Sequence, residues 1–168
     1  MKTLITILFL SLLSSPSWSE DMLGLHYRDG LYYEPFSDVP FTGDIASDGW
    51  SKGTINNGKK HGTWISYWEN GQPHHKENYI NGNKEGEWIS YWENGQLNQK
   101  GNYKNGKREG AWIEYYSGGG LYQKGTYKNG REEGMWIKYE THGGYMKNLS
   151  GIYKDGKKIS DLPKTEND

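Results

Sequence analysis

The feature that most constrains this sequence is a repeat of 24 residues. Tryptophan recurs at this interval at Trp64, Trp88, Trp112 and Trp136. The same step relates three further columns: Gly62, Gly86, Gly110 and Gly134; Ile65, Ile89, Ile113 and Ile137; and Tyr67, Tyr91, Tyr115 and Tyr139. A period of this length predicts an array of similar units, each of which packs mainly on its neighbours.

Each unit has the pattern of a β-hairpin. Two runs rich in aromatic residues, 88–92 and 97–103, are separated by Asn94-Gly95, a pair that favours a type I′ turn. A second Asn-Gly pair, such as Asn105-Gly106, joins each hairpin to the next. Because 15% of the residues are aromatic and 24 are glycine, apolar burial must come mainly from rings placed between turns. The predicted fold is all-β, a single-layer antiparallel meander or solenoid of about four to five stacked hairpins.

The turn at Asn94-Gly95 also predicts the strand register. It pairs Trp92 with Leu97, Trp88 with Gly101 and Gly86 with Tyr103, all on one face of the sheet. We expect the core to be columns of rings on this face: Trp64, Trp88, Trp112, Trp136, Tyr79, Tyr103, Tyr127 and Tyr153. Equivalent rings should lie about 10 Å apart, bridged by the tyrosines and by the second tryptophan of a unit, such as Trp92. Trp136, in the last unit, should contribute less to stability than the central Trp88 and Trp112.

The opposite face is mixed in character, because lysines lie across from the isoleucines in the same register. A single-layer sheet buries only one face well, so this second face should remain partly exposed. It is the candidate partner-binding face, and its residues are Ile65, Ile89, Ile113, Tyr67, Tyr91, Tyr115, Lys76, Lys100 and Lys124.

The N-terminus has the pattern of an export signal. Lys2 precedes an apolar run from Leu4 to Leu13, and Ser17-Trp18-Ser19 provides small residues for cleavage after Ser19. We therefore predict a signal peptide at 1–19 and a periplasmic or secreted protein. The remainder divides into an N-terminal cap at 20–52, a repeat domain at 53–157 and a flexible tail at 158–168. The absence of cysteine excludes disulfides and thiolate metal sites.

The segment 101–112, Gly-Asn-Tyr-Lys-Asn-Gly-Lys-Arg-Glu-Gly-Ala-Trp, resembles the MORN repeat. The segment 86–95, in which a Gly-x-Trp-x-x-Tyr strand precedes Asn-Gly, is more similar to the bacterial variant of that repeat. Asp29-Gly30 and Pro40 to Gly43 resemble the degenerate opening segment of such proteins. Bacterial relatives are described as antitoxin-like or immunity-like partners of toxins, so the resemblance implies a protein partner and, more specifically, a toxin.

The sequence offers no candidate catalytic, cofactor-binding or metal-binding residues. His74 and His75, as neighbours in a strand, should point to opposite faces, which argues against a shared metal site. Glu85, Glu109 and Glu133 are identical copies about 10 Å apart, unlike the close, dissimilar pair that acid-base catalysis needs. We interpret these three glutamates as solvated turn residues that balance Lys84 and Arg108.

Two functional hypotheses follow. The first is a protein-binding module that occludes a toxin through the face of isoleucines, tyrosines and lysines. The alternative is an envelope protein whose aromatic columns contact glycan or lipid headgroups. The formal net charge of −1 argues against nucleic acid as a partner and gives no support to membrane contact.

Overall fold

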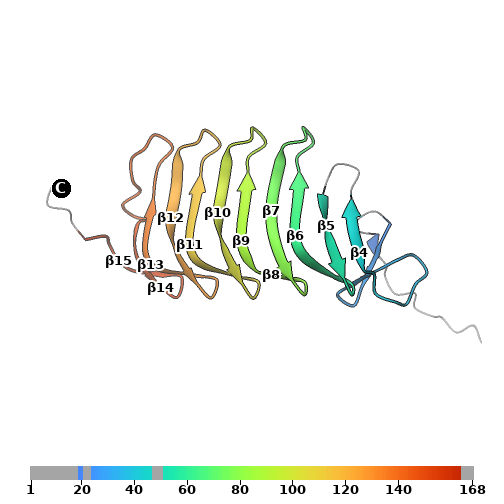
Figure 1. Ribbon diagram of the computed structural model, residues 1–168. Coiled ribbons are helices and arrows are strands. Elements are labelled where there is room, and N and C mark those ends of the chain that lie inside the picture. The colour runs from blue at the N-terminus through green and yellow to red at the C-terminus, as the bar shows by residue number, and fades with distance from the viewer. Residues whose placement is uncertain (1–18, 21–23, 47–50, 164–168) are drawn as a thin grey trace, which may run out of the picture.

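The chain is all-β over the residues that the computed structural model describes, 19–20, 24–46 and 51–163 (Figure 1). Its main part is one open antiparallel sheet in the order β15-β14-β13-β12-β11-β10-β9-β7-β6-β5-β4, with β8 paired to β7. Strands that are neighbours in sequence are therefore neighbours in space, as the predicted meander requires. A separate three-stranded sheet, β1-β2-β3, precedes it.

The strands of the small sheet are β1 (Ser19–Glu20), β2 (His26–Arg28) and β3 (Leu31–Tyr33). Those of the main sheet are β4 (Gly43–Ala46), β5 (Ser51–Asn56), β6 (Lys59–Tyr67), β7 (Pro73–Ile80), β8 (Asn83–Lys84), β9 (Gly86–Tyr91), β10 (Leu97–Lys104), β11 (Lys107–Tyr115), β12 (Leu121–Lys128), β13 (Arg131–Lys138), β14 (Gly151–Lys154) and β15 (Lys157–Ser160). The main sheet thus begins inside the predicted cap and continues three residues into the predicted flexible tail. Residues 1–18 of the predicted signal peptide lie outside the described residues.

The turns that join one repeat to the next have the predicted type I′ geometry. Asn105 and Gly106 both have positive φ, 50° and 74°, as both central residues of that turn require. The same pattern occurs at Asn57-Gly58, Asn81-Gly82, Asn129-Gly130 and Asp155-Gly156. These turns lie at the lower edge of the sheet in Figure 1.

The turns at the upper edge differ from the prediction. At Asn94-Gly95 only Gly95 has positive φ, and Trp92 both accepts a hydrogen bond from the Gly95 N–H and donates one to the Gln96 carbonyl, each at 2.8 Å. This is a three-residue loop with a bulge. Leu97 consequently pairs with Tyr91, not with Trp92, while the predicted pairs Trp88–Gly101 and Gly86–Tyr103 are confirmed.

The side chain of Asn94 explains the longer loop. Its Oδ1 accepts a hydrogen bond from the Gln96 N–H at 3.0 Å, and its Nδ2 donates to the Ser117 carbonyl of the next repeat at 2.8 Å. These bonds hold the loop in an Asx-type turn. Asn94 therefore links two repeats as well as closing its own hairpin.

A bend in every second strand allows the single sheet to enclose a core. Between Lys100 and Asn102 of β10, the paired residue on β11 changes from Ile113 to Glu109, so β11 carries two extra residues there. Gly110 adopts φ 76° within this bulge. The hairpin beyond it then runs toward the preceding repeat, where the Gly106 N–H donates to the Lys84 carbonyl at 2.9 Å.

The tryptophan rings are buried within this bend. Trp112 is 2% exposed and stacks on Trp88 at 5.4 Å between ring centroids, with an interplanar angle of 19°. The Arg108 guanidinium lies 4.6 Å from the Trp112 ring centroid, and Tyr127 meets that ring edge-on at 5.7 Å. The ring is therefore enclosed by backbone, aromatic and cationic groups without a second layer of structure.

The spacing of these rings differs from the predicted interval of about 10 Å. Trp112 leans across β10 because Gly101 has no side chain, and this brings it into direct contact with Trp88. Tyr127 bridges Trp112 and Trp136 as expected, at 5.7 and 4.9 Å. The second tryptophan of a unit does not bridge the columns; Trp92 Nε1 donates instead to the Tyr115 carbonyl at 3.1 Å.

The predicted minor role of Trp136 rested on a terminal position, and the structure contradicts that premise. Trp136 is 0% exposed, because β14 and β15 continue the sheet beyond it. Tyr153 on β14 is buried in the same hydrophobic cluster. The edge of the core lies one hairpin further along the chain than the tryptophan column suggests.

The three glutamates predicted to be solvated turn residues instead connect the repeats. Glu85 Oε2 accepts a hydrogen bond from the Asn105 N–H at 2.7 Å, and Glu109 Oε2 accepts one from the Asn129 N–H at 2.8 Å. Glu133 Oε2 likewise accepts a hydrogen bond from the Asp155 N–H at 3.2 Å. Each carboxylate satisfies a backbone donor in the next type I′ turn, so it joins two successive units.

Candidate functional site

The face opposite the tryptophans carries an unbroken row of alternating lysine and isoleucine. Direct strand pairing aligns eight residues in the order Lys52, Ile65, Lys76, Ile89, Lys100, Ile113, Lys124, Ile137. We call these eight residues the Lys-Ile row. It crosses β5, β6, β7, β9, β10, β11, β12 and β13, so every lysine lies between isoleucines of the adjacent strands, except Lys52, which has one such neighbour.

The row has a local positive charge that the net charge of the chain conceals. All four lysines are exposed and the isoleucines are half-buried. Lys100 pairs with Glu87 at 2.9 Å, and hydrogen bonding to Lys100 holds the pKa of Glu87 below its ordinary value. Lys76 and Lys124 form no ion pair with any of the described residues. The row therefore presents unneutralised cations beside apolar surface.

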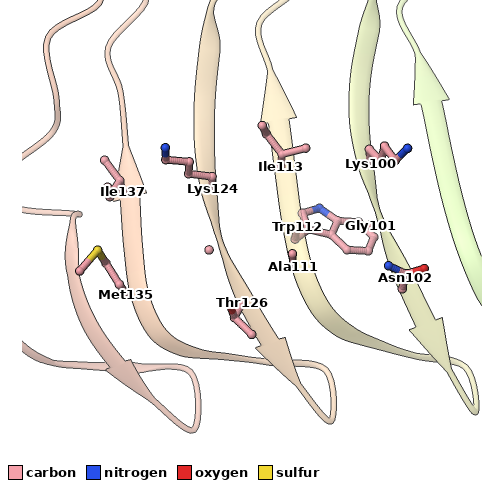
Figure 2. Close-up of a pocket in the computed structure, with 11 residues that line it drawn as sticks. Lys100, Gly101, Asn102, Ala111, Trp112, Ile113, Lys124, Thr126, Met135 and Ile137 are labelled. Carbon is pink, nitrogen blue, oxygen red and sulfur yellow. The ribbon is translucent and has the colours of Figure 1, made fainter.

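A hollow of about 520 Å³ opens beside the row over β10 to β13 (Figure 2). Figure 2 shows two lines of side chains at its rim: Lys100, Ile113, Lys124 and Ile137 in one, and Asn102, Ala111, Thr126 and Met135 in the other. Gly101, Trp112 and Gly125 complete the lining. Ala111 and Thr126 are small, and Met135 is 51% exposed, so the hollow is a partly apolar depression with a basic edge.

The tyrosines of the candidate face lie at the upper end of the same strands. Tyr67, Tyr91 and Tyr115 are half-buried, and the Lys52 ammonium lies 5.6 Å from the Tyr67 ring centroid. The backbone carbonyls of Tyr91 and Tyr115 accept hydrogen bonds from Trp68 Nε1 and Trp92 Nε1, each at 3.1 Å. The structure thus places all nine candidate residues on one face, with the tyrosines also part of the contact between repeats.

A second, polar hollow of about 310 Å³ interrupts the tryptophan face. It is lined by Ser51, Lys60, Trp64, Ile65, Ser66, His75 and Glu77. Glu77 occupies the column filled elsewhere by Gly53, Gly101 and Gly125, and it separates two hydrophobic clusters, one containing Trp64 and the other Trp88. The core is therefore two hydrophobic clusters with a charged group between them.

Glu77 is satisfied by three donors. Its Oε1 accepts hydrogen bonds from Lys84 Nζ at 2.8 Å and Trp88 Nε1 at 3.0 Å, and its Oε2 accepts a short one from Tyr79 Oη. Burial alone raises the pKa of Glu77, but the hydrogen bonds from Lys84, Tyr79 and Trp88 bring that pKa below its ordinary value. The carboxylate is therefore charged at neutral pH although it is half-buried between the two clusters.

The two adjacent histidines lie together, contrary to the prediction that they point to opposite faces. Their ring centroids are 3.7 Å apart, and Trp68 and Trp88 flank them at 3.8 and 5.4 Å. The reason is a bulge opposite Tyr67, which breaks the strict alternation of side chains. Burial lowers the pKa of His75 to about 4, and its buried Nδ1 has no hydrogen-bond partner in the structure.

Within the described residues, no group of three or more His, Cys, Asp or Glu side chains is arranged to hold a metal ion. The same part of the chain includes no helix with the length and apolar composition needed to cross a bilayer.

These features define a β-hairpin repeat protein with one face buried and the other open for contacts. Residues 60–81, 84–105 and 108–129 match the family model described as MORN repeat variant. The chain thus contains three segments similar to that repeat. β13 with β14 adds a fourth hairpin that keeps the tryptophan and the bend glycine, and the type I′ turn at Asp155-Gly156 follows it. No curated protein matches the sequence.

Sequence reasoning identified the face and its Ile–Lys pairs but missed the continuity of the row across repeats, the second line of the hollow and the polar break in the core. Asn102, Ala111, Thr126 and Met135 are chemically unlike one another, so no column of repeated residues marks them. Glu77 did carry a signal, since it is the single charged residue among the glycines of its column at 53, 101 and 125. A comparison of each residue with the other residues of its repeat column would have identified Glu77.

Proposed function

We propose that this chain is an exported, non-catalytic repeat protein that binds a protein partner through the Lys-Ile row and the adjacent hollow. The observation that carries the proposal is the row itself: four exposed lysines alternate with half-buried isoleucines across eight strands. Interfaces typically combine apolar contact with charges that steer a complementary partner. A surface of this kind fits a protein whose own surface is acidic and partly apolar.

The more specific proposal is that the partner is a toxin, which the chain would neutralise by binding over the toxin's functional surface. The support is the resemblance of the repeats to those of antitoxin-like and immunity-like bacterial proteins. The mechanism is steric, so it needs no catalytic residue in this chain. Export through the segment 1–19 would place both proteins in the periplasm or outside the cell.

Capture of partners from the native envelope tests the proposal. We expect the wild-type protein to retain a partner that the double variant Lys76→Glu, Lys124→Glu loses, because the variant reverses two exposed cations of the row that form no ion pair with any of the described residues. Lys100 is less suitable, since its reversal would leave Glu87 facing a second negative charge.

Lys104→Glu, Lys128→Glu is the matched control, because it makes the same change of charge at exposed positions outside the row. Lys104 and Lys128 lie at the turns, four residues beyond Lys100 on β10 and Lys124 on β12. Equal capture by both variants at equal melting temperature would overturn the assignment of this face. Retention of peptidoglycan or anionic lipid without a protein would favour the envelope-binding function instead.

A further inference from the structure

We infer that the Lys-Ile row is a docking site for an acidic amphipathic α-helix that lies across the strands. This inference rests on the proposed function and specifies the partner at the same face. It depends on the spacing of the row, on the order of its residues and on the hollow beside it.

The spacing is set by strand geometry. Successive lysines of the row lie two strands apart, which corresponds to about 10 Å in an antiparallel sheet. An α-helix rises about 1.5 Å per residue, so positions seven residues apart are separated by about 10.5 Å and lie on nearly the same side. Carboxylates at a heptad interval can therefore face Lys76, Lys100 and Lys124 together.

The order of the row distinguishes a helix from other backbones. Ile89 lies midway between Lys76 and Lys100, and Ile113 lies midway between Lys100 and Lys124. In an α-helix, the residue three or four positions after an acidic residue lies on the same face, about halfway to the next heptad. An apolar residue there would contact the isoleucine.

Extended peptides do not reproduce this alternation. Side chains on one face of a β-strand recur about every 6.7 Å, which does not match the lysine interval of about 10 Å. A polyproline II segment repeats every three residues, about 9.3 Å, but its intermediate side chains point away from the shared face. A polyproline II segment could therefore place carboxylates beside the lysines, but it would place no apolar side chain against the isoleucines.

The hollow provides an anchor for one larger apolar side chain of the helix. It lies between the row and the second line of residues, and its volume of about 520 Å³ exceeds that of any single side chain. Ala111 and Thr126 leave this space open, and the exposed Met135 offers an adaptable apolar wall. Lys76 and Lys124, which lack carboxylate neighbours in ion-pair range among the described residues, supply the charge that acidic residues would complement.

A labelled synthetic peptide about three heptads long, with glutamates seven residues apart and leucines midway between them, tests this geometry. A control isomer has the same composition with glutamates five residues apart, and a second control is a proline-rich peptide with glutamate at every third position. We expect the heptad peptide to bind at least about tenfold more tightly than either control and to gain helical circular dichroism on binding. Binding should weaken with salt.

Lys76→Glu, Lys124→Glu should abolish binding of the heptad peptide, and Lys104→Glu, Lys128→Glu should preserve it. Equal affinity for the isomer, preference for the proline-rich peptide or no peptide binding would overturn the inference. So would binding to phosphatidylglycerol vesicles that needs Lys76 and Lys124 while the heptad peptide fails to bind. If envelope capture still yields a protein dependent on these lysines, only the helical geometry is wrong; if it yields none, the proposed function fails too.

Discussion

Trp112 occupies the space that a side chain at Gly101 would need: a Cβ built on Gly101 would lie 1.8 Å from Trp112 Cε3. We predict that Gly101→Ala destabilises the protein by about 1 to 3 kcal/mol or more, because the ring is confined on its other sides and cannot move away. Gly118→Ala is the matched control, since a Cβ there meets nothing within 4 Å. Urea denaturation compares the two, and equal stability would show that the ring tolerates displacement.

We predict that Trp136→Ala costs as much as Trp112→Ala, about 3 to 5 kcal/mol each, because both rings are almost fully enclosed. A position near the end of the repeat array would by itself suggest a smaller effect. Denaturant midpoints of the two variants test the prediction, and a mild Trp136 variant beside a severe Trp112 variant would contradict it.

We predict that Glu109→Ala lowers stability by about 1 kcal/mol, because it removes the acceptor for the Asn129 N–H in the next repeat. Glu109→Gln should retain most of the stability, since the amide oxygen can still accept that hydrogen bond. Glu69→Ala, at an exposed position, is the control for the loss of a negative charge alone. Amide hydrogen exchange at Asn129 should accelerate in Glu109→Ala; unchanged protection would mean that the carboxylate is dispensable.

We predict that His75 makes the protein less stable as the pH falls from about 6.5 toward 4. Burial lowers the pKa of His75 from 6.5 to about 4, so in this window the unfolded chain binds a proton that the folded chain does not. The contribution of His75 is therefore intact above about pH 6.5 and is lost on acidification.

Replacement of His75 with glutamine, the residue at the equivalent positions Gln99 and Gln123, should flatten the dependence of stability on pH. His61→Gln, at an exposed position, is the matched control for removal of a histidine. Urea midpoints measured between neutral pH and about pH 5 decide this, and parallel curves for wild type and His75→Gln would refute the role of this histidine.

The local features of the fold could be predicted because their causes lie within a few residues of one another. Asn105-Gly106 favours a type I′ turn by its own backbone preferences, and a turn of known type fixes the pairing of the strands that it joins. Because successive side chains along a strand alternate between its two faces, Ile113 and Trp112 then point to opposite faces of the sheet. The candidate face and its Ile–Lys pairs were therefore visible in the sequence. The continuous Lys-Ile row also needs the bulge, because the turn alone would place Lys100 opposite Ala111, whereas Lys100 pairs with Ile113.

The relationships between repeats were decided by the tertiary structure. The bend at Gly110 swings each lower hairpin toward its predecessor, and only then does Glu109 reach the Asn129 N–H and Arg108 cover Trp112. The bulge that places His74 beside His75, and the longer loop at Asn94, likewise depend on contacts with neighbouring strands. Turn type and side-chain alternation are set by short-range sterics along the chain, whereas the angle of the bend is set by packing between units that the 24-residue period does not specify.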